Sequence, residues 1–190
     1  MTPVMNTNQA VDQRSRATIM SELATVLGRT DASTTSIEAA IAKSGVPKQE
    51  ISAKFGGTRE LILAMVAQLS DLMSAPLTID SQEASFTQRL VEFGQRVIDF
   101  YATSHLRSLY RIAVTDSIRH TGLGRDFYEA GPGRLTQRLT HFLQTAQAAS
   151  ALRCGEPAHL LASHFLSLLR AELDEADALP HELATNPLVR

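Results

Sequence analysis

The chain has 190 residues, enough for one ordinary domain or for two small domains that share a core. A hydrophobic content of 44% with 20% charged residues is typical of a folded soluble protein, and no apolar run approaches the roughly 20 residues that a bilayer span needs. The formal net charge of -2 excludes a polycation, and a single cysteine, Cys154, excludes an internal disulfide framework. These features, with an N-terminus that lacks the apolar core of a secretory signal, predict a cytoplasmic protein with no membrane partner.

Helical periodicity runs through nearly the whole chain, because apolar residues recur three and four positions apart. No segment shows the alternating pattern of a convincing strand. We therefore predict an all-α fold with eight or nine helices. The repeats that carry this prediction are Ile19, Leu23, Val26 and Leu27; Leu61, Met65, Leu69 and Leu72; Phe86, Leu90, Phe93, Val97, Phe100 and Tyr101; and Leu135, Leu139, Phe142 and Ala146.

Prolines and glycines mark the expected helix ends. Residues 75–81 are predicted to separate a helix that ends near Met73 from a long helix that begins near Ser85. Further along, glycines bracket a short helix with the sequence LGRDFYEA, at residues 123–130. Pro132 can occupy the first turn of the next helix, where its missing N–H costs nothing.

Residues 35–47 carry the signals of a helix followed by a tight turn. Thr35 and Glu38 have the spacing of a capping box, which predicts a helix that runs to about Lys43. The sequence Ser-Gly-Val at residues 44–46 then predicts a turn, because glycine can adopt a positive φ. Pro47 is expected to start a second helix at a position that tolerates proline.

The second helix is short and polar on its outer face. Gly56-Gly57 is predicted to end it, and Thr58 to cap the helix that follows. Helix, tight turn and short second helix are the parts of a helix-turn-helix that reads the DNA major groove. The expected apolar side of this unit consists of Ile37, Ile41, Val46, Ile51 and Phe55.

The N-terminal third resembles the DNA-binding domain of TetR-family repressors. The spacing between Thr35 and Gly45, and between Gly45 and Phe55, fits that family without a gap, and the first helix RATIMSELATVLGR also fits. In the second half, residues 127–132 match a Phe-Tyr-Glu-Ala-Gly-Pro segment found in the ligand-binding half of one TetR-like branch, so the resemblance covers roughly residues 14–175. The matching residues of the helix-turn-helix are Thr35, Ser36, Gly45, Val46, Lys48, Phe55 and Leu61.

This resemblance implies a TetR-like all-α protein in three parts: a disordered N-terminus at 1–13, a helix-turn-helix DNA-binding domain at 14–74, and a helical effector-binding and dimerisation domain at 82–190. It implies a homodimeric transcription regulator that leaves a palindromic operator on double-stranded DNA when a small-molecule effector binds. The residues are compatible with repression and with activation, and repression is the commoner habit of the family.

Several departures from the family pattern leave a second interpretation open. Ser52 stands where a tyrosine commonly contacts a phosphate, Lys54 where a histidine or tyrosine is common, and Thr58 where a lysine is common. Glu50 adds a negative charge close to the expected phosphates, and seven Lys or Arg against six Asp or Glu leave residues 1–70 only one unit positive. The alternative is a TetR-fold protein with a vestigial helix-turn-helix that acts through protein partners.

The first interpretation assigns specific DNA contacts. Lys48 suits guanine acceptors and Gln49 suits adenine, so these two are expected to meet base edges. Lys54 and Arg59 can supply cations to phosphates, and the hydroxyls can donate hydrogen bonds there. The expected DNA-binding residues are Thr35, Ser36, Pro47, Lys48, Gln49, Ser52, Lys54, Thr58 and Arg59.

The resemblance also implies a ligand cavity and a dimer face in the second half. An aromatic stripe with helical spacing is more often packed core than ligand contact, so Tyr101, Asp116 and His141 are the more informative members, since buried polar groups need partners. The expected ligand-binding residues are Phe93, Val97, Phe100, Tyr101, Tyr110, Asp116, Phe127, His141 and Phe142. The expected dimer-interface residues, on a helix that is apolar on two sides, are Leu161, Phe165, Leu168 and Leu169.

Catalysis is not expected from this sequence. His159 and His164 are five residues apart, which places them on different faces of a helix and makes a poor metal pair. No glycine-rich phosphate loop follows a strand, and no cysteine–histidine or serine–histidine set stands out. We therefore expect no enzyme activity, no metal and no cofactor.

Overall fold

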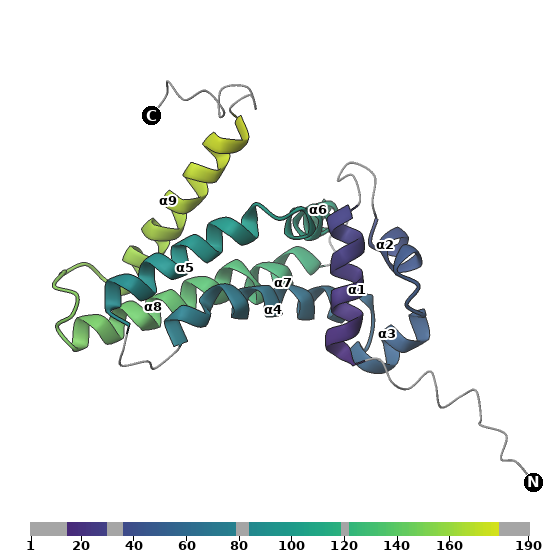
Figure 1. The fold of residues 1–190 in the computed structure, drawn as a ribbon, viewed down its shortest axis with the longest axis horizontal. Helices are drawn as coiled ribbons and strands as arrows, with labels where there is room; N and C mark the ends of the chain where they lie inside the picture. Colours follow the sequence, from purple (N-terminus) through teal and green to yellow (C-terminus); the bar gives the residue numbers. More distant parts are fainter. Residues whose placement is uncertain (1–14, 30–35, 79–83, 119–121, 179–190) are drawn as a thin grey trace, which may run out of the picture.

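The computed structural model describes residues 15–29, 36–78, 84–118 and 122–178. Within these ranges the fold is all-α, as predicted, with nine helices and no strand (Figure 1). The helices are α1 (Arg16–Arg29), α2 (Ile37–Ser44), α3 (Lys48–Phe55), α4 (Thr58–Thr78), α5 (Phe86–Tyr101), α6 (Ser104–Ile118), α7 (Leu123–Ala130), α8 (Pro132–Ala148) and α9 (Ala158–Ala178).

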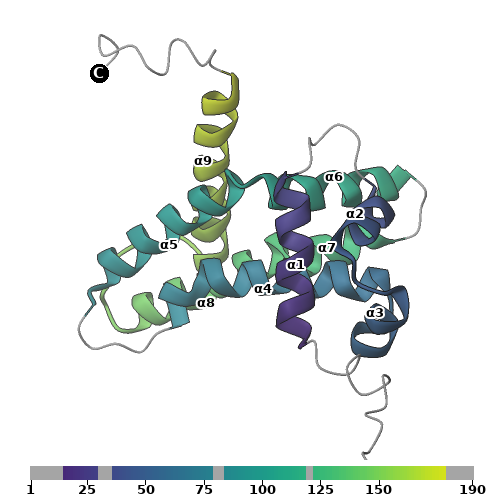
Figure 2. The same cartoon turned by 45° about the vertical axis from the view of Figure 1, so that its right-hand side comes forward.

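The helices form a small N-terminal group and a larger body. Helices α1, α2 and α3 pack together at one end of the molecule, and α4 continues from α3 into the body, where it packs on α5, α7 and α8. Helix α1 also packs on α6, which attaches the small group to the body at a second place. Figures 1 and 2 agree that α9 rises away from the layer of α4, α5 and α8. Because α4 belongs to both parts, it is the element that connects them.

One continuous hydrophobic core holds both parts together. It extends from α1 through α4 to α9, so the small group and the body share it. Burial of such side chains is the main favourable term in folding, at about 25 cal/mol per Å² of apolar surface. The largest fully buried apolar side chains include Ile19, Leu23, Leu27, Ile51, Leu61, Ile62, Phe93, Leu109, Leu135 and Leu139.

The predicted end of a helix near Met73 is wrong, because α4 continues through Pro76. Proline has no N–H, so the carbonyl of Leu72 loses its partner within the helix. In the structure Arg96 Nη1, from α5, donates to that carbonyl at 3.1 Å. A hydrogen bond from a distant helix therefore offsets the local cost of the proline.

The last carbonyls of α4 are satisfied in the same way. Arg89, also from α5, donates through Nε to Pro76 O at 3.0 Å and through Nη2 to Leu77 O at 2.8 Å. Because α4 ends at Thr78, these carbonyl oxygens have no N–H donor within the helix. Two arginines of α5 thus hold the C-terminal half of α4 as a helix.

Helix α4 is long and apolar enough, by length and composition, to cross a membrane. However, 56% of its most apolar window is buried inside the protein. Its one acidic residue in the C-terminal half, Asp71, forms ion pairs with Arg134 at 2.9 Å and with Arg138 at 2.5 Å, both from α8. We conclude that α4 is a core helix of the folded protein.

Candidate functional site

Helix α2 begins one residue later than the sequence pattern predicts. Ser36 is the capping residue, since its Oγ accepts a hydrogen bond from Ala39 N at 3.3 Å. Thr35, the predicted cap, lies outside the described residues. With Ser36 as the cap, the third helical position is Ala39 and not Glu38, so no side chain can reach back to complete the predicted capping box.

The predicted turn between α2 and α3 is confirmed. Gly45 has φ 70°, a left-handed conformation that costs glycine little. Ser44 Oγ donates to Ile41 O at 2.8 Å and accepts from Val46 N at 3.3 Å, so it links the end of α2 to the turn. Pro47 then occupies the capping position of α3, which leaves no N–H unsatisfied there.

Helix α3 has one buried and one exposed face. Ile51 and Phe55 are buried as predicted, and Lys48, Gln49 and Ser52 are exposed. Ser52 lies four residues after Lys48 and three after Gln49, which places the three side chains on the same side of the helix. These residues form a polar, solvent-exposed face on α3.

Glu50 does not contribute to that polar face. Its side chain is only 7% exposed, and Oε1 has no hydrogen-bond partner. The sequence-based expectation that Glu50 places a negative charge near DNA phosphates is therefore wrong. The third helical position points toward the core when Pro47 is the cap, and proline offers no N–H for the glutamate to reach.

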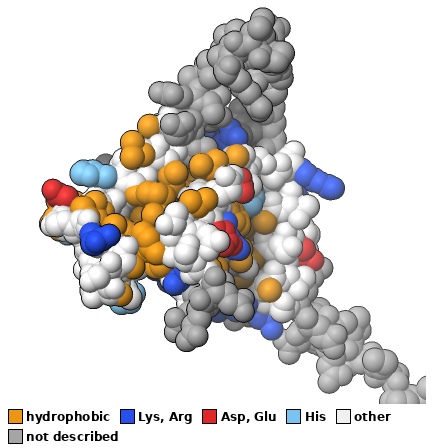
Figure 3. All heavy atoms as spheres, turned by 60° about the vertical axis from the view of Figure 1, so that its left-hand side comes forward, with side chains coloured by type: hydrophobic (Ala, Val, Ile, Leu, Met, Phe, Trp, Pro, Cys, Tyr) orange, Lys and Arg blue, Asp and Glu red, His pale blue; other side chains and the backbone are white. Residues whose placement is uncertain are grey.

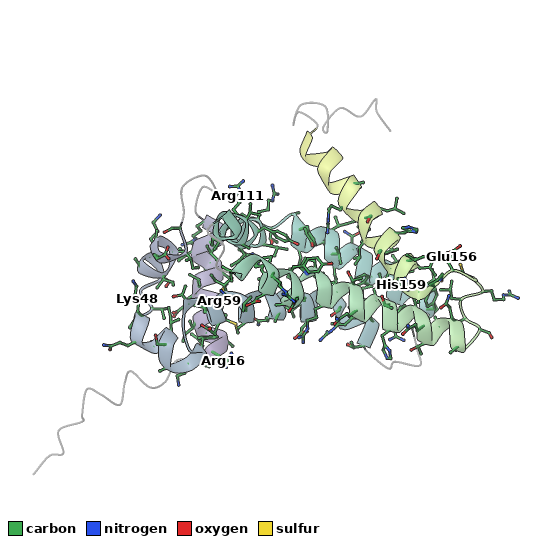
Figure 4. All side chains as sticks on the ribbon, turned by 180° about the vertical axis from the view of Figure 1, so that it is seen from behind. Arg16, Lys48, Arg59, Arg111, Glu156 and His159 are labelled. Carbon is green, nitrogen blue, oxygen red and sulfur yellow. The ribbon has the colours of Figure 1, made fainter. Side chains whose placement is uncertain are left out.

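Arg16 is a basic residue near α3 that local sequence spacing did not identify. Its guanidinium lies over the ring of Phe55, 4.5 Å from the centroid. Arg16 is the first residue of α1, far from the helix-turn-helix along the chain, and only its basic character marked it in the sequence. In Figure 4, Arg16 and Lys48 lie at the end of the molecule opposite to Glu156 and His159.

The start of α4 also differs from the prediction. Leu61 N donates to Gly57 O at 3.1 Å, and Thr58 is the first helical residue. Gly57 therefore occupies the capping position that was predicted for Thr58. The carboxylate of Glu60 folds back to within 2.8 Å of where a β-carbon on Gly57 would lie, so a larger residue there would require the flexible end of Glu60 to move. Thr58 is partly buried in the first turn of α4.

Arg59 pairs with the larger body of the protein. Its Nη2 donates to Asp126 Oδ2 of α7 at 2.5 Å. Both side chains are about 40% exposed, at 37% and 41%. Lys54, the other expected phosphate contact, is partly buried at the end of α3. The structure thus separates Arg59 from Lys48, Gln49 and Ser52, which share the outer face of α3.

Helix α7 connects this ion pair to the interior of the body. The residue after Asp126, Phe127, is buried and packs edge-to-face on Tyr110 of α6, with ring centroids 5.0 Å apart. The next residue, Tyr128, is 59% exposed and lines a pocket on the other side of the helix. Three consecutive residues of one short helix therefore contact α4, α6 and a pocket.

That pocket, which we call the outer pocket, has a volume of about 190 Å³. It lies between α5, α7, α8 and α9, and it contains two of the residues predicted to bind a ligand, Val97 and Tyr101. Its walls combine apolar side chains with hydroxyl groups and one cation. The lining residues are Val97, Tyr101, Tyr128, Pro132, Leu135, Thr136, Ser163, Leu166, Ser167 and Arg170.

Tyr101, which lines the outer pocket, forms a pair with Tyr110 of α6. Tyr101 and Tyr110 place their hydroxyl oxygens 3.0 Å apart. Burial, followed by the influence of Tyr101, raises the pKa of Tyr110 well above its ordinary value, while the nearby guanidinium of Arg170 acts in the opposite direction. Behind this pair lies a void of only about 10 Å³ that Phe127 also lines, at the lower limit for a single water molecule.

The remaining predicted ligand-binding residues lie elsewhere. His141 and Phe142 line a groove of about 710 Å³ at the end of the body formed by α4, α5 and α8. Phe93 is fully buried and stacks on Phe165, and Phe100 packs against the core. The side chain of Asp116 lies outside the described residues. The predicted residues therefore divide among the outer pocket, the void behind it, the distal groove and the core.

Helix α9 carries the predicted dimer-interface residues on two different faces. Phe165 and Leu169 approach Gly94 of α5, at 3.4 and 3.8 Å from where its β-carbon would lie, so both are engaged within the chain. Leu161 is also partly buried against the core. Leu168, by contrast, is 69% exposed.

Among its described side chains, helix α9 carries two exposed large apolar residues. Leu160 and Leu168, two turns apart, are both exposed on α9. Figure 3, which looks at the end of the molecule opposite to α1–α3, shows hydrophobic side chains gathered in one band across this face. Large apolar patches on a soluble protein usually mark an interaction surface.

No group of three or more metal-ligating side chains that could hold an ion occurs in the described part of the chain.

Comparisons with known proteins show that this chain is similar to transcriptional regulators. A family model described as the C-terminal domain of AefR-like transcriptional repressors matches residues 88–178. The chain is similar to a TetR-family transcriptional regulator from Mesorhizobium loti MAFF303099, with 25% identity and a TM-score of 0.63, over 86% of this chain and 85% of that one. It is also similar to the flavonoid-responsive regulator FrrA, with 25% identity and a TM-score of 0.56, over 87% of this chain and 89% of that one. No curated protein is similar enough in sequence to match.

Proposed function

The chain belongs to the TetR family of transcriptional regulators, and we propose that it is a homodimeric repressor that a small-molecule effector releases from a palindromic operator. In this proposal residues 14–74 read double-stranded DNA in the cytoplasm, and residues 82–190 bind the effector and form the dimer. The role is regulatory and requires no catalytic step. The resemblance expected from the sequence is thereby confirmed at the level of the family.

The observation that carries this proposal is the outer face of α3. Lys48, Gln49 and Ser52 are exposed together at the free end of the small helical group, where nothing else in the described structure covers them. Their chemistry suits an operator, because lysine and glutamine can bind base edges and serine can donate to a phosphate. Two such faces, one from each subunit, would meet half-sites about one helical turn apart.

The burial of Glu50 weakens the case for a vestigial helix-turn-helix. One reason to doubt DNA binding was a carboxylate beside the expected phosphates, and this carboxylate is turned into the core. Arg16, at the end of α3 near Phe55, adds a cation to the same region. The electrostatic balance of the DNA-facing surface is therefore more favourable than the summed charge of residues 1–70 suggests.

Control by an effector is supported by the position of α7. A ligand in the outer pocket would contact Tyr128, and the neighbouring Asp126 is bonded to Arg59 in the first turn of α4. A ligand shifts DNA affinity only if it binds two conformations of the protein unequally. A displacement of α7 would distinguish two such conformations, because α7 contacts both the outer pocket and Arg59. The similarity to a flavonoid-responsive regulator also favours control by a small molecule.

The proposed dimer uses the exposed side of α9. Leu160 and Leu168 remain exposed in the single chain, and a second copy would bury them. Phe165 and Leu169 would support the interface from beneath, since they hold α9 against α5. The surface is isologous in a two-fold dimer, because each subunit presents the same patch.

A selection of genomic DNA fragments by the purified protein tests the proposal. The selection is made at moderate salt with the free protein and, in parallel, with a small-molecule cell extract added. Enrichment of a near-palindrome, with affinity that falls as salt rises, is the expected result, because counterions leave the phosphates on binding. If the folded protein enriches no sequence in either arm, the proposal is wrong and a partner-binding function with a retained helix-turn-helix shape replaces it.

A further inference from the structure

We propose that the outer pocket binds a small aromatic monoanion, with Arg170 as the side chain that pairs with its negative charge. This inference rests on the proposed function, because it names the chemical class of the effector. It is argued from the size of the pocket, the chemistry of its walls and the position of its single cation.

The size of the outer pocket suits a ligand with one aromatic ring. Its volume is about 190 Å³, and a protein cavity of about 150 Å³ is known to hold benzene. Sites for drug-sized ligands are larger, at about 300–1,000 Å³. The void behind Tyr101 adds only about 10 Å³, so the pocket accommodates one ring and a small substituent without rearrangement.

Part of the wall is suited to a flat apolar ring. Tyr101 and Tyr128 contribute aromatic rings from α5 and α7, and aromatic pairs favour offset or edge-to-face contacts. Val97 and Leu166 add aliphatic surface, and Pro132 at the start of α8 adds a rigid one. These groups can cover the faces of a ring and exclude water from it.

The polar part of the wall is dominated by groups that can donate hydrogen bonds. Thr136, Ser163 and Ser167 contribute hydroxyls, and the hydroxyl of Thr136 already donates to Pro132 O at 2.9 Å. No carboxylate is among the lining residues in the described part of the chain. An anion would therefore find donors here, whereas an ammonium ligand would meet a like charge and no counter-charge.

Arg170 is the only charged residue that lines the outer pocket in the described structure. Its side chain is exposed, and a guanidinium carries five N–H donors that a ligand can accept from. Its guanidinium also acts to lower the pKa of Tyr110, the hydrogen-bond partner of Tyr101, although burial of Tyr110 has the larger and opposite effect. Arginine matches a carboxylate through two parallel hydrogen bonds.

The larger distal groove is a poorer site for such an anion. Its two arginines are already engaged: Arg89 donates to Pro76 O and Leu77 O, and Arg138 pairs with Asp71. An anion there would have to compete with these contacts, which hold α4 in place. The groove is also remote from α7, so a ligand in it has no direct contact with the Asp126–Arg59 pair.

Calorimetric titration with four single-ring probes tests this inference. Benzoate is the anion, benzamide and benzyl alcohol are neutral, and benzylamine is a cation. We expect benzoate to bind at least tenfold more tightly than the neutral probes, and benzylamine not to bind. Arg170→Gln should weaken benzoate binding about tenfold to a hundredfold, as expected for a charge-assisted hydrogen bond, and Arg170→Lys should restore part of the loss. Arg153→Gln, a change at an exposed arginine between α8 and α9, is the matched control and should have no effect.

The outcomes separate this inference from the proposed function. Equal affinity for benzoate and benzamide, no binding by any probe at millimolar concentration, or an unchanged affinity in the folded Arg170→Gln protein would each overturn the ligand class. Operator binding by the ligand-free protein is measured independently. If DNA binding fails while benzoate still binds through Arg170, the pocket assignment holds and the DNA-binding proposal is the one that is wrong.

Discussion

Asp126 of α7 accepts a hydrogen bond from Arg59 of α4 at 2.5 Å, and this ion pair joins the first turn of α4 to α7 in the larger body of the protein. Asp126→Asn should raise operator affinity by up to about fivefold, because an exposed pair of this kind contributes about 0–1 kcal/mol and its loss lets Arg59 turn toward a phosphate. Fluorescence anisotropy with labelled operator measures the effect.

Glu129→Gln provides the control for this prediction. Glu129 lies on the same helix and pairs with Arg125 at 3.1 Å, but that pair stays within α7. Its removal should leave operator affinity unchanged. If both substitutions change affinity equally, the effect comes from the net charge of α7 and the Asp126–Arg59 contact has no special role.

Substitutions of Lys48 or Gln49 should act differently from a substitution of Lys54. Lys48→Ala or Gln49→Ala should relax base preference, with a loss of about tenfold to a hundredfold on the cognate site only, because bidentate base contacts discriminate by about 1–3 kcal/mol. Lys54→Ala should weaken binding to cognate and scrambled sites alike and reduce the salt slope by about one. Equal losses on both sites for Lys48→Ala would contradict the base-reading role.

The exposed apolar residues of α9 predict a concentration-dependent dimer. Leu168→Glu should shift the protein toward monomer in analytical ultracentrifugation, because it places a charge on the surface that a second copy would bury. Val114→Glu, at a valine that is 60% exposed on α6, is the matched control and should leave the dimer intact. A monomeric wild-type protein at tens of micromolar would remove the basis of this prediction.

The passage of α4 through Pro76 depends on Arg96, and a double-mutant cycle can measure this. Arg96→Ala should lower the free energy of unfolding by about 1 kcal/mol, since the carbonyl of Leu72 loses its donor. In a Pro76→Ala background the N–H of residue 76 can donate to the carbonyl of Leu72, so Arg96→Ala should lower the free energy of unfolding by a smaller amount. Chemical denaturation of the four proteins gives the coupling, and an equal cost in both backgrounds would show that Arg96 acts independently of the proline.

His105 predicts a small loss of stability in acid. Burial lowers the pKa of this half-buried histidine below its ordinary value. The unfolded chain therefore takes up a proton at a higher pH than the folded protein, and stability falls as the pH drops through about 6.5. His105→Gln should flatten this part of the stability profile, and an unchanged profile would mean that other groups cause the pH dependence.

Much of the helix-turn-helix could be predicted from the sequence, because its signals are local. The turn at Gly45 requires a positive φ, and the apolar positions Ile41 and Ile51 follow the helical period, so each depends only on residues within one or two turns. Two of the errors there were shifts of a single residue, from Thr35 to Ser36 and from Thr58 to Gly57, and a third was the exposure expected of Glu50, which is buried. Neighbouring hydroxyl and glycine residues satisfy similar capping roles, and the register is decided by which apolar side chains enter the core.

What only the tertiary structure decided involves groups that lie far apart along the chain. Arg96 donates to the carbonyl that Pro76 leaves without a partner, Arg59 pairs with Asp126, and the predicted ligand-binding residues divide among an outer pocket, a small void, a distal groove and the core. Helical periodicity identifies which residues share a face, but it does not identify the face that packs against it. The sequence by itself therefore determined most of the helices, the family resemblance and the exposed polar face of α3, whereas packing between distant helices determined where the pockets lie and which contacts join α7 to α4.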